Sequence, residues 1–128
     1  MKKILLLIAT VALIGCQESL EERCAREAKE YTKKNCPTQV TQEITLDSMT
    51  FDTKSHTIAY CYTVSGEIDD STVINSNNPQ GRLLEQVKNT PNLKLYKDAD
   101  YNFRYVYYST KNNGTKLFDA TFRKKDYQ

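Results

Sequence analysis

Residues 101–122, YNFRYVYYSTKNNGTKLFDATF, decide which fold the sequence predicts. Aromatic side chains alternate with polar ones on both sides of a polar centre, which is typical of strands whose successive side chains point to opposite faces of a sheet. Asn113 and Gly114 in that centre favour a tight hairpin turn. We therefore predict a β-hairpin whose buried face consists of Tyr101, Phe103, Tyr105, Tyr107, Phe118, Ala120 and Phe122.

A second hairpin is predicted upstream, in residues 40–66, VTQEITLDSMTFDTKSHTIAYCYTVSG. Its turn lies at residues 52–56, and Ile58, Tyr60, Tyr62 and Val64 share one face of its second strand. A helix precedes each hairpin. The first runs from about Leu20 to Lys34, begins with the capping-box spacing of Ser19 and Glu22, and is ended by Pro37. The second runs from about Pro79 to Asn89, with Asn78 as its N-cap.

The two halves of the chain follow one pattern. Each helix ends in a Lys-Asn-x-Pro tetrad, at residues 34–37 and 88–91, and a hairpin with aromatic residues follows. We predict an α+β fold of two αββ units, which form a four-stranded antiparallel sheet with two helices packed on one face. Residues 20–128 form this single domain. If the resemblance of the halves is a coincidence of two helix-hairpin units, the fold class is the same.

The N-terminus is predicted to be an export signal that does not belong to the fold. Lys2 and Lys3 precede an apolar run from Ile4 to Gly15, which is too short for the ~20 residues of a membrane-spanning helix. The run ends in Leu-Ile-Gly-Cys, which resembles the lipobox of bacterial lipoprotein signals. That resemblance implies a signal peptide at 1–15, lipidation of Cys16, and a lipidated tether at 16–19 that holds the protein at a membrane. The alternative is an ordinary signal peptide.

The expected location is the cell envelope, with the protein anchored by lipid. Gln17 after the acylated cysteine is compatible with the outer membrane, and the acidic residues Glu18, Glu21 and Glu22 resemble surface-export signals of some bacteria. Loss of Lys2 and Lys3 with the signal takes the formal charge of the full chain, +2, to zero. Because no block of like charges is left, we expect no nucleic-acid partner.

Four stretches carry a family resemblance: CPTQVTQEITLDSMTFD, YCYTVSG, FRYVYYST and FDATFRKKDY. They resemble a group of small exported bacterial proteins of uncharacterised function, many of them lipoproteins, which share an αββ-type domain. The resemblance implies an α+β fold and supplies no catalytic residue. Val40 is followed by Thr41, where that group is expected to carry an acidic residue, so no carboxylate role is carried over to this position.

Residues that could support catalysis are few. The single histidine, His56, lies in the predicted turn of the first hairpin. Asp69 and Asp70 lie in a segment from Gly66 to Gly81 whose composition is typical of a surface loop. We favour solvated residues in both places, and we therefore expect no enzyme activity, no cofactor and no metal. The alternative is an envelope enzyme that uses His56 or the Asp69–Asp70 pair.

Three cysteines follow the lipobox. Their spacing contains no Cys-x-x-Cys pair, so a zinc site is not expected. Cys24 and Cys36 lie too far apart along the first helix for a bridge, at 1.5 Å of helix per residue. Outside the cytoplasm we therefore expect one disulfide that joins Cys61 to either Cys36 or Cys24. The alternative is three free thiols.

A candidate binding patch lies on the sheet face opposite the predicted core. The patch consists of Arg104, Val106, Tyr108 and Arg123. We favour ordinary pairing across a sheet surface as the explanation of these residues, and contact with a protein or a glycan is the alternative. The sequence thus predicts a membrane-anchored, non-catalytic binding or structural module. A second hypothesis is an inhibitor that blocks a secreted enzyme with the loop from Gly66 to Gly81.

Overall fold

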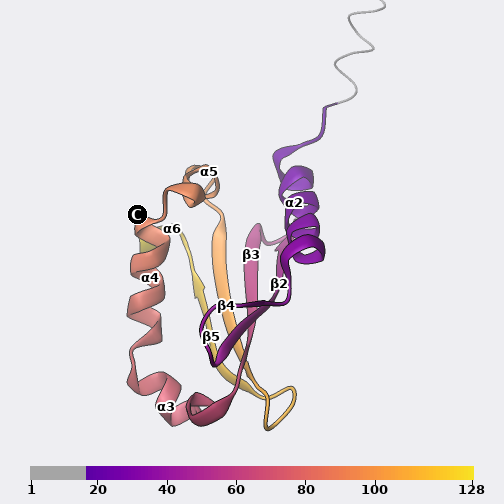
Figure 1. Cartoon of the computed structure of the whole chain (residues 1–128). Coiled ribbons are helices and arrows are strands. Elements are labelled where there is room, and N and C mark those ends of the chain that lie inside the picture. Colours follow the sequence, from indigo (N-terminus) through magenta and orange to yellow (C-terminus); the bar gives the residue numbers. More distant parts are fainter. Residues whose placement is uncertain (1–16) are drawn as a thin grey trace, which may run out of the picture.

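The computed structural model describes residues 17–128 (Figure 1). The expected signal peptide and Cys16 lie outside the described residues. Within them, no helix is both long enough and apolar enough to span a membrane. The helices are α2 (Leu20–Asn35), α3 (Ser71–Ser76), α4 (Pro79–Asn89), α5 (Lys94–Asp98) and α6 (Lys124–Tyr127), with short 3₁₀ turns at Gly66–Ile68 and Pro91–Leu93. The strands are β1 (Thr38–Gln39), β2 (Ile44–Asp52), β3 (Thr57–Val64), β4 (Asn102–Ser109) and β5 (Lys116–Phe122).

The strands form one five-stranded sheet in the order β1-β2-β3-β4-β5. Both predicted hairpins are present: β2 pairs antiparallel with β3, and β4 pairs antiparallel with β5. The prediction of a four-stranded, wholly antiparallel sheet is wrong. β1 adds a short fifth strand, and β3 lies parallel to β4, with Thr57 opposite Asn102 and Val64 opposite Ser109. The fold class, α+β, is confirmed, with a mixed sheet.

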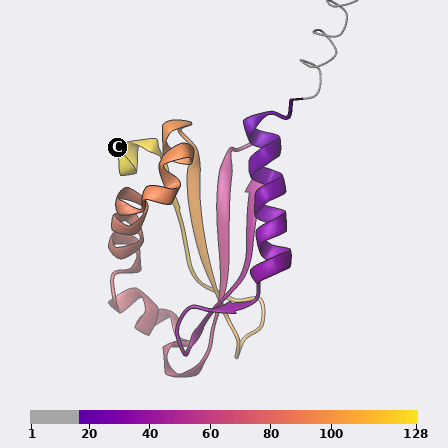
Figure 2. The ribbon, with the colours of Figure 1, turned by 45° about the horizontal axis from the view of Figure 1, so that its top comes forward.

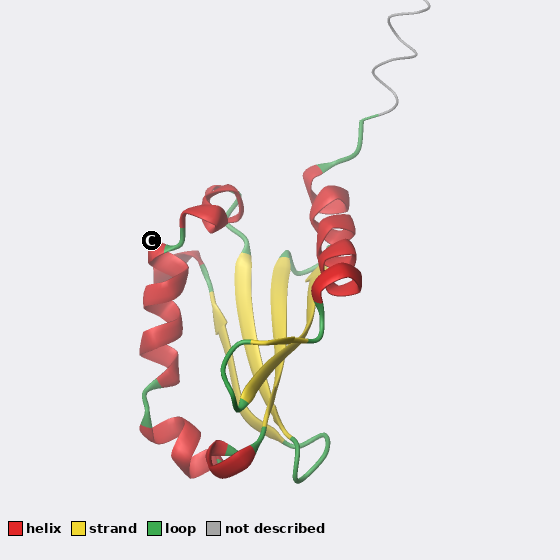
Figure 3. Ribbon diagram, in the orientation of Figure 1, coloured by secondary structure: helices red, strands yellow, loops and turns green. Residues whose placement is uncertain are grey.

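The long connection from β3 to β4 explains the parallel pair. Parallel neighbours need a crossover that returns the chain to the end of the sheet at which the first strand began. Here α3, α4 and α5 make that return, so β4 starts beside Thr57 (Figure 3). The segment from Gly66 to Gly81, expected to be a loop, is therefore mostly helical. The layout of two equal αββ units does not match either, because the second helix is followed by α5 before its hairpin begins.

One face of the sheet, here called the inner face, carries the core. Ile58, Phe103 and Phe122 are buried there against Leu83 and Val87 of α4. Leu83 and Val87 lie one helical turn apart, and their burial holds α4 on the sheet. The predicted aromatic face is confirmed as part of this core, since its members are buried or packed against it: Tyr101, Phe103, Tyr105, Tyr107, Phe118, Ala120 and Phe122. The opposite face, here called the open face, bears Arg104, Asp119 and Thr121.

Helix α2 lies along the sheet edge beside β2 rather than in a two-helix layer with α4 (Figure 2). It begins as predicted, because the Ser19 side chain accepts a hydrogen bond from the Glu22 N–H. Its Thr32 hydroxyl donates to the Met49 carbonyl (2.8 Å) and accepts from the Met49 N–H (2.9 Å). The helix thereby satisfies backbone groups that β1, only two residues long, leaves unpaired at the edge of β2.

Candidate functional site: a groove beside α4

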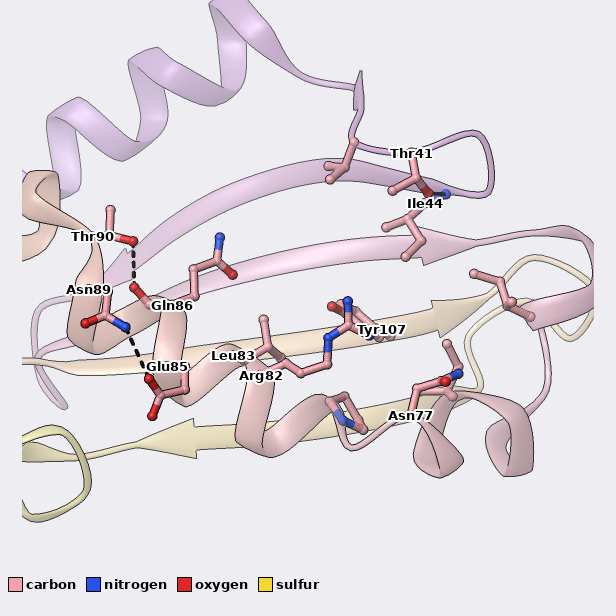
Figure 4. A pocket seen from close by; sticks show the side chains of 14 residues that line it. Thr41, Ile44, Asn77, Arg82, Leu83, Glu85, Gln86, Asn89, Thr90 and Tyr107 are labelled. Carbon is pink, nitrogen blue, oxygen red and sulfur yellow. Dashed lines mark hydrogen bonds between the residues drawn. The ribbon is translucent and has the colours of Figure 1, made fainter.

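A groove of about 640 Å³ runs between α4 and the segment that leads into β2 (Figure 4). Its walls come from elements far apart in sequence, and its lining is more apolar than polar. The apolar part comes from Val40, Ile44, Ile68, Ile74, Leu83 and Tyr107. The polar part comes from Thr41, Asn77, Arg82, Glu85, Gln86, Asn89 and Thr90, with Pro79 at one end.

The polar wall of the groove is one side of α4. Asn78 caps this helix: its side chain accepts a hydrogen bond from the Gly81 N–H (3.2 Å), and Pro79 occupies the first turn. Because Leu83 and Val87 point into the core, Arg82, Gln86 and Asn89 are left along the adjacent helix surface, at a spacing of three to four residues. The Asn89 amide donates to the Glu85 carboxylate (3.2 Å), which fixes both side chains on the rim (Figure 4).

The opposite wall is a tight turn between β1 and β2. The N–H groups of Val40 and Thr41 donate to the Ile44 carbonyl (2.9 and 3.2 Å). The Ser65 N–H donates to the Glu43 carbonyl (2.8 Å), which ties the turn to the end of β3. Val40 is 56% exposed and is one of the few large apolar side chains with that exposure. The turn therefore presents an apolar side chain to solvent at a fixed position on the groove.

Tyr107 of β4 and Arg82 of α4 meet at the base of the groove (Figure 4). Tyr107 is held edge-on against Tyr62, with ring centroids 5.1 Å apart. Burial raises the pKa of Tyr107, and the positive charge of Arg82 partly offsets this rise. Arg82 forms no ion pair with any side chain in residues 17–128. The groove thus combines a fixed apolar surface with an uncompensated guanidinium.

The predicted patch residues lie together on the open face, but two of them have structural roles. Arg104 forms two parallel hydrogen bonds with Asp119 (2.9 and 2.7 Å), which also pairs with Lys116. Val106 is only 1% exposed. Arg104 and Arg123 border a shallow depression of about 410 Å³ that is lined mainly by threonines and acidic residues. Binding of a protein or glycan at Arg104, Val106, Tyr108 and Arg123 stays a prediction.

The candidate catalytic residues are placed in separate structural roles. Asp70 is the N-cap of α3 and accepts from the Thr72 N–H (2.7 Å). Asp69 is buried and accepts from the N–H groups of Thr110 (3.1 Å) and Lys111 (2.8 Å), so it does not act with Asp70 as an acid–base pair. His56 lies in the β2–β3 turn, 3.9 Å from the Glu21 carboxylate and next to the Tyr101 ring.

The three described cysteines are free thiols in this structure. Cys24 is buried on α2, while Cys61 points to the open face, because its neighbours Tyr60 and Tyr62 pack against the inner core. A disulfide between Cys61 and either Cys36 or Cys24 stays a prediction for oxidised protein, and the orientation of Cys61 favours Cys36 as the partner. Within residues 17–128, no three His, Cys, Asp or Glu side chains gather into a potential metal site.

Sequence reasoning did not single out the groove. In the sequence Val40 belongs only to a family motif, and Arg82 belongs to none of the motifs described above. One signal was available: Arg82, Gln86 and Asn89 form a polar stripe directly beside the apolar Leu83 and Val87 on a short helix. The other wall could not be located from the sequence, because it depends on the long-range packing of the β1–β2 turn.

Comparison with solved structures shows that the same fold occurs in other proteins. A "putative secreted protein" of Pseudomonas aeruginosa superimposes with a TM-score of 0.67 at 12% identity, over 88% of this chain and 100% of that one. The pilotin EpsS of the Vibrio vulnificus type 2 secretion system gives 0.63 at 8% identity, over 85% and 92%. The type II secretion system pilotin AspS of Vibrio cholerae gives 0.57 at 14% identity, over 90% and 98%. At these identities the likeness concerns the fold alone.

Comparison of sequences gives a family. Among curated proteins, none matches the chain significantly. Residues 19–118 match the family model described as "Domain of unknown function (DUF8479)". This match covers α2, all of β1 to β4 and the start of β5, and therefore both walls of the groove. The chain belongs to the DUF8479 family.

Proposed function

We propose that the protein is a lipid-anchored, non-catalytic module of the cell envelope that binds a segment of a partner protein in the groove beside α4. The observation that carries this proposal is the exposed Val40. It lies on a fixed turn and lines a groove of about 640 Å³ whose other wall is α4. An apolar wall opposite a polar rim fits an amphipathic segment, whose apolar side chains enter the groove while its polar side chains meet the rim.

The shared fold of the pilotins supports this proposal. The two pilotins belong to type II secretion systems, and the chain matches both of them over most of its length. We propose that this chain, like them, is a non-catalytic component of a larger protein assembly. Lipidation of Cys16, with the signal peptide at 1–15 and the domain at 20–128, belongs to the same proposal, as does an outer-membrane location.

The alternatives expected from the sequence have weaker support. The inhibitor hypothesis relied on a protruding loop from Gly66 to Gly81, and that segment folds into α3 and the start of α4. The enzyme hypothesis relied on Asp69 and Asp70, which fix a turn and cap a helix. His56 is held beside Glu21 and Tyr101, far from the groove lining.

The groove is tested with a photo-crosslinking amino acid placed at Val40 in growing cells. We expect a crosslink from Val40 to one defined segment of one envelope protein. A crosslinker at Leu95, which is also a large and exposed apolar residue but does not line the groove, is the matched control. The segment is then synthesised, and its affinity for the full chain in detergent is measured with and without Val40→Asp. Equal binding to the Val40→Asp protein would contradict the proposal.

The anchor is tested separately with a palmitate analogue in cells that express the wild type or Cys16→Ala. We expect labelling of the wild type only. Protease added to intact cells then distinguishes a surface-exposed protein, which is cleaved, from one that faces the interior of the envelope, which is protected. Labelling that persists in Cys16→Ala would remove the lipid anchor from the proposal and leave the groove untouched.

A further inference from the structure

We infer that Arg82 makes the groove selective for segments that carry a carboxylate beside their apolar side chains. This inference rests on the proposed function, since it names the chemistry of the segment that the groove would hold. Arg82 lines the groove one helical turn after the α4 N-cap, and its side chain extends toward Tyr107 (Figure 4).

The charge of Arg82 is not used by the fold. Arg23 pairs with Glu27 (2.9 Å), Arg26 with Glu18 (2.6 Å), and Arg104 with Asp119 (2.7 Å). No carboxylate among residues 17–128 lies within ion-pair distance of Arg82. Glu85, three residues further along α4, is instead hydrogen bonded to Asn89. The guanidinium therefore lies in the groove with no carboxylate partner among the described residues.

A bound segment would change the surroundings of this charge. When apolar side chains of the segment cover Ile44, Ile68 and Tyr107, they displace water from around Arg82. Removing water from a guanidinium without giving it a new partner costs free energy. A carboxylate compensates this cost, because it accepts two parallel hydrogen bonds from the guanidinium. Neutral segments should therefore bind more weakly than acidic ones. In this way an unpaired charge makes binding specific.

The neighbouring charge also orients the segment. Glu85 lies on the same wall and repels a second carboxylate placed near it. The acidic group of the segment is thus directed to the part of the groove between Arg82 and Asn77, close to the start of α4. A basic or amide group is favoured one helical turn further along, beside Glu85 and Asn89.

The test is selection of a displayed library of random 15-residue peptides against the full chain in detergent. We expect Val40-dependent binders enriched in Asp or Glu, whose affinity falls about tenfold or more with Arg82→Gln, as for loss of a charged hydrogen-bond pair. Replacing the peptide's own acid by its amide should lower affinity for the wild type and have little effect with Arg82→Gln. Selection against Arg82→Glu should enrich Lys or Arg, which a misfolded variant would not do.

A control and three outcomes make the test decisive. Lys88→Gln removes a charge from the same helix outside the groove lining and should leave affinity unchanged. Binders that are sensitive to Val40→Asp but lack acids, or that ignore Arg82→Gln, would overturn this inference and leave the proposed function standing. Absence of any peptide sensitive to Val40→Asp would overturn both.

Discussion

Asp69 connects two distant turns through one buried carboxylate. Its Oδ2 accepts the N–H groups of Thr110 and Lys111 in the turn after β4, while its own backbone begins the crossover from β3. The Ser109 hydroxyl beside it and these N–H groups hold the pKa of Asp69 below its ordinary value of 3.8. The charged form is therefore the one that stabilises the fold.

We predict that Asp69→Asn destabilises the protein at pH 7 and that this deficit shrinks in acid. Because the folded-state pKa lies below the unfolded value, the stabilisation is present above pH 3.8 and is lost as the pH falls through the lowered pKa. Urea unfolding of both proteins at pH 7 and at a pH below 3.8 checks this. Asp98→Asn, at an exposed ion pair, is the control and should differ little from the wild type. A deficit of equal size at both values would contradict the role of the charge.

At the scale of elements, α2 acts on the sheet as an additional edge strand would. Thr32 is central to this, because its hydroxyl bonds both the N–H and the carbonyl of Met49. We predict that Thr32→Val, which keeps the shape and removes the hydroxyl, costs about 1–3 kcal/mol. Hydrogen exchange at the Met49 amide should become faster by more than the change in global stability explains.

The matched control for that prediction is Thr50→Val. Thr50 follows Met49 in β2, and its side chain is exposed. Within residues 17–128 the Thr50 hydroxyl forms no hydrogen bond, so its removal should change stability by no more than about 0.5 kcal/mol. If both variants behaved alike, the contact of α2 with the edge of β2 would not be what protects Met49.

Local signals predicted the elements, and long-range packing decided their arrangement. Ser19, Pro37, Asn78 and Pro79 mark helix ends by their own chemistry, so α2 and α4 were predicted almost to the residue. The parallel pairing of β3 with β4 depends on which end of the sheet the crossover reaches, and no short stretch of sequence records that. The groove was missed for the same reason, since Val40 and Arg82 come to line one groove only after the crossover has folded.

At the scale of the whole molecule, stacked phenols join the strands of the inner face. Tyr60 stacks on Tyr105 with ring centroids 5.0 Å apart, and burial raises the pKa of both. The pKa of Tyr60 reaches about 12, as does that of Tyr101, which is buried and donates to Glu21. Because the pKa values of these phenols are raised in the folded protein, we expect their ionisation to destabilise the fold.

We predict alkaline unfolding between about pH 10 and pH 12. A folded-state pKa raised above the unfolded value of 10 gives stability that is present below pH 10 and is lost as the pH rises toward 12. Phenolate absorbance and circular dichroism measured in one titration should show the inner tyrosines ionising together with unfolding. Tyr60→Phe should make the loss of stability less steep. Ionisation of all nine tyrosines near pH 10 with the fold intact would contradict this.

The position of the first turn of α2 has a consequence for how far the protein reaches. Glu21 lies beside His56 and Tyr101, at the end of the sheet formed by the β2–β3 turn, whereas Thr41 and Ile44 of the groove lie where β2 begins. The nine residues of β2 span about 30 Å between these ends. If Cys16 carries the lipid that we propose, the domain would act as a spacer about as long as a bilayer is thick, and its groove would be open to segments of a partner that do not enter the lipid.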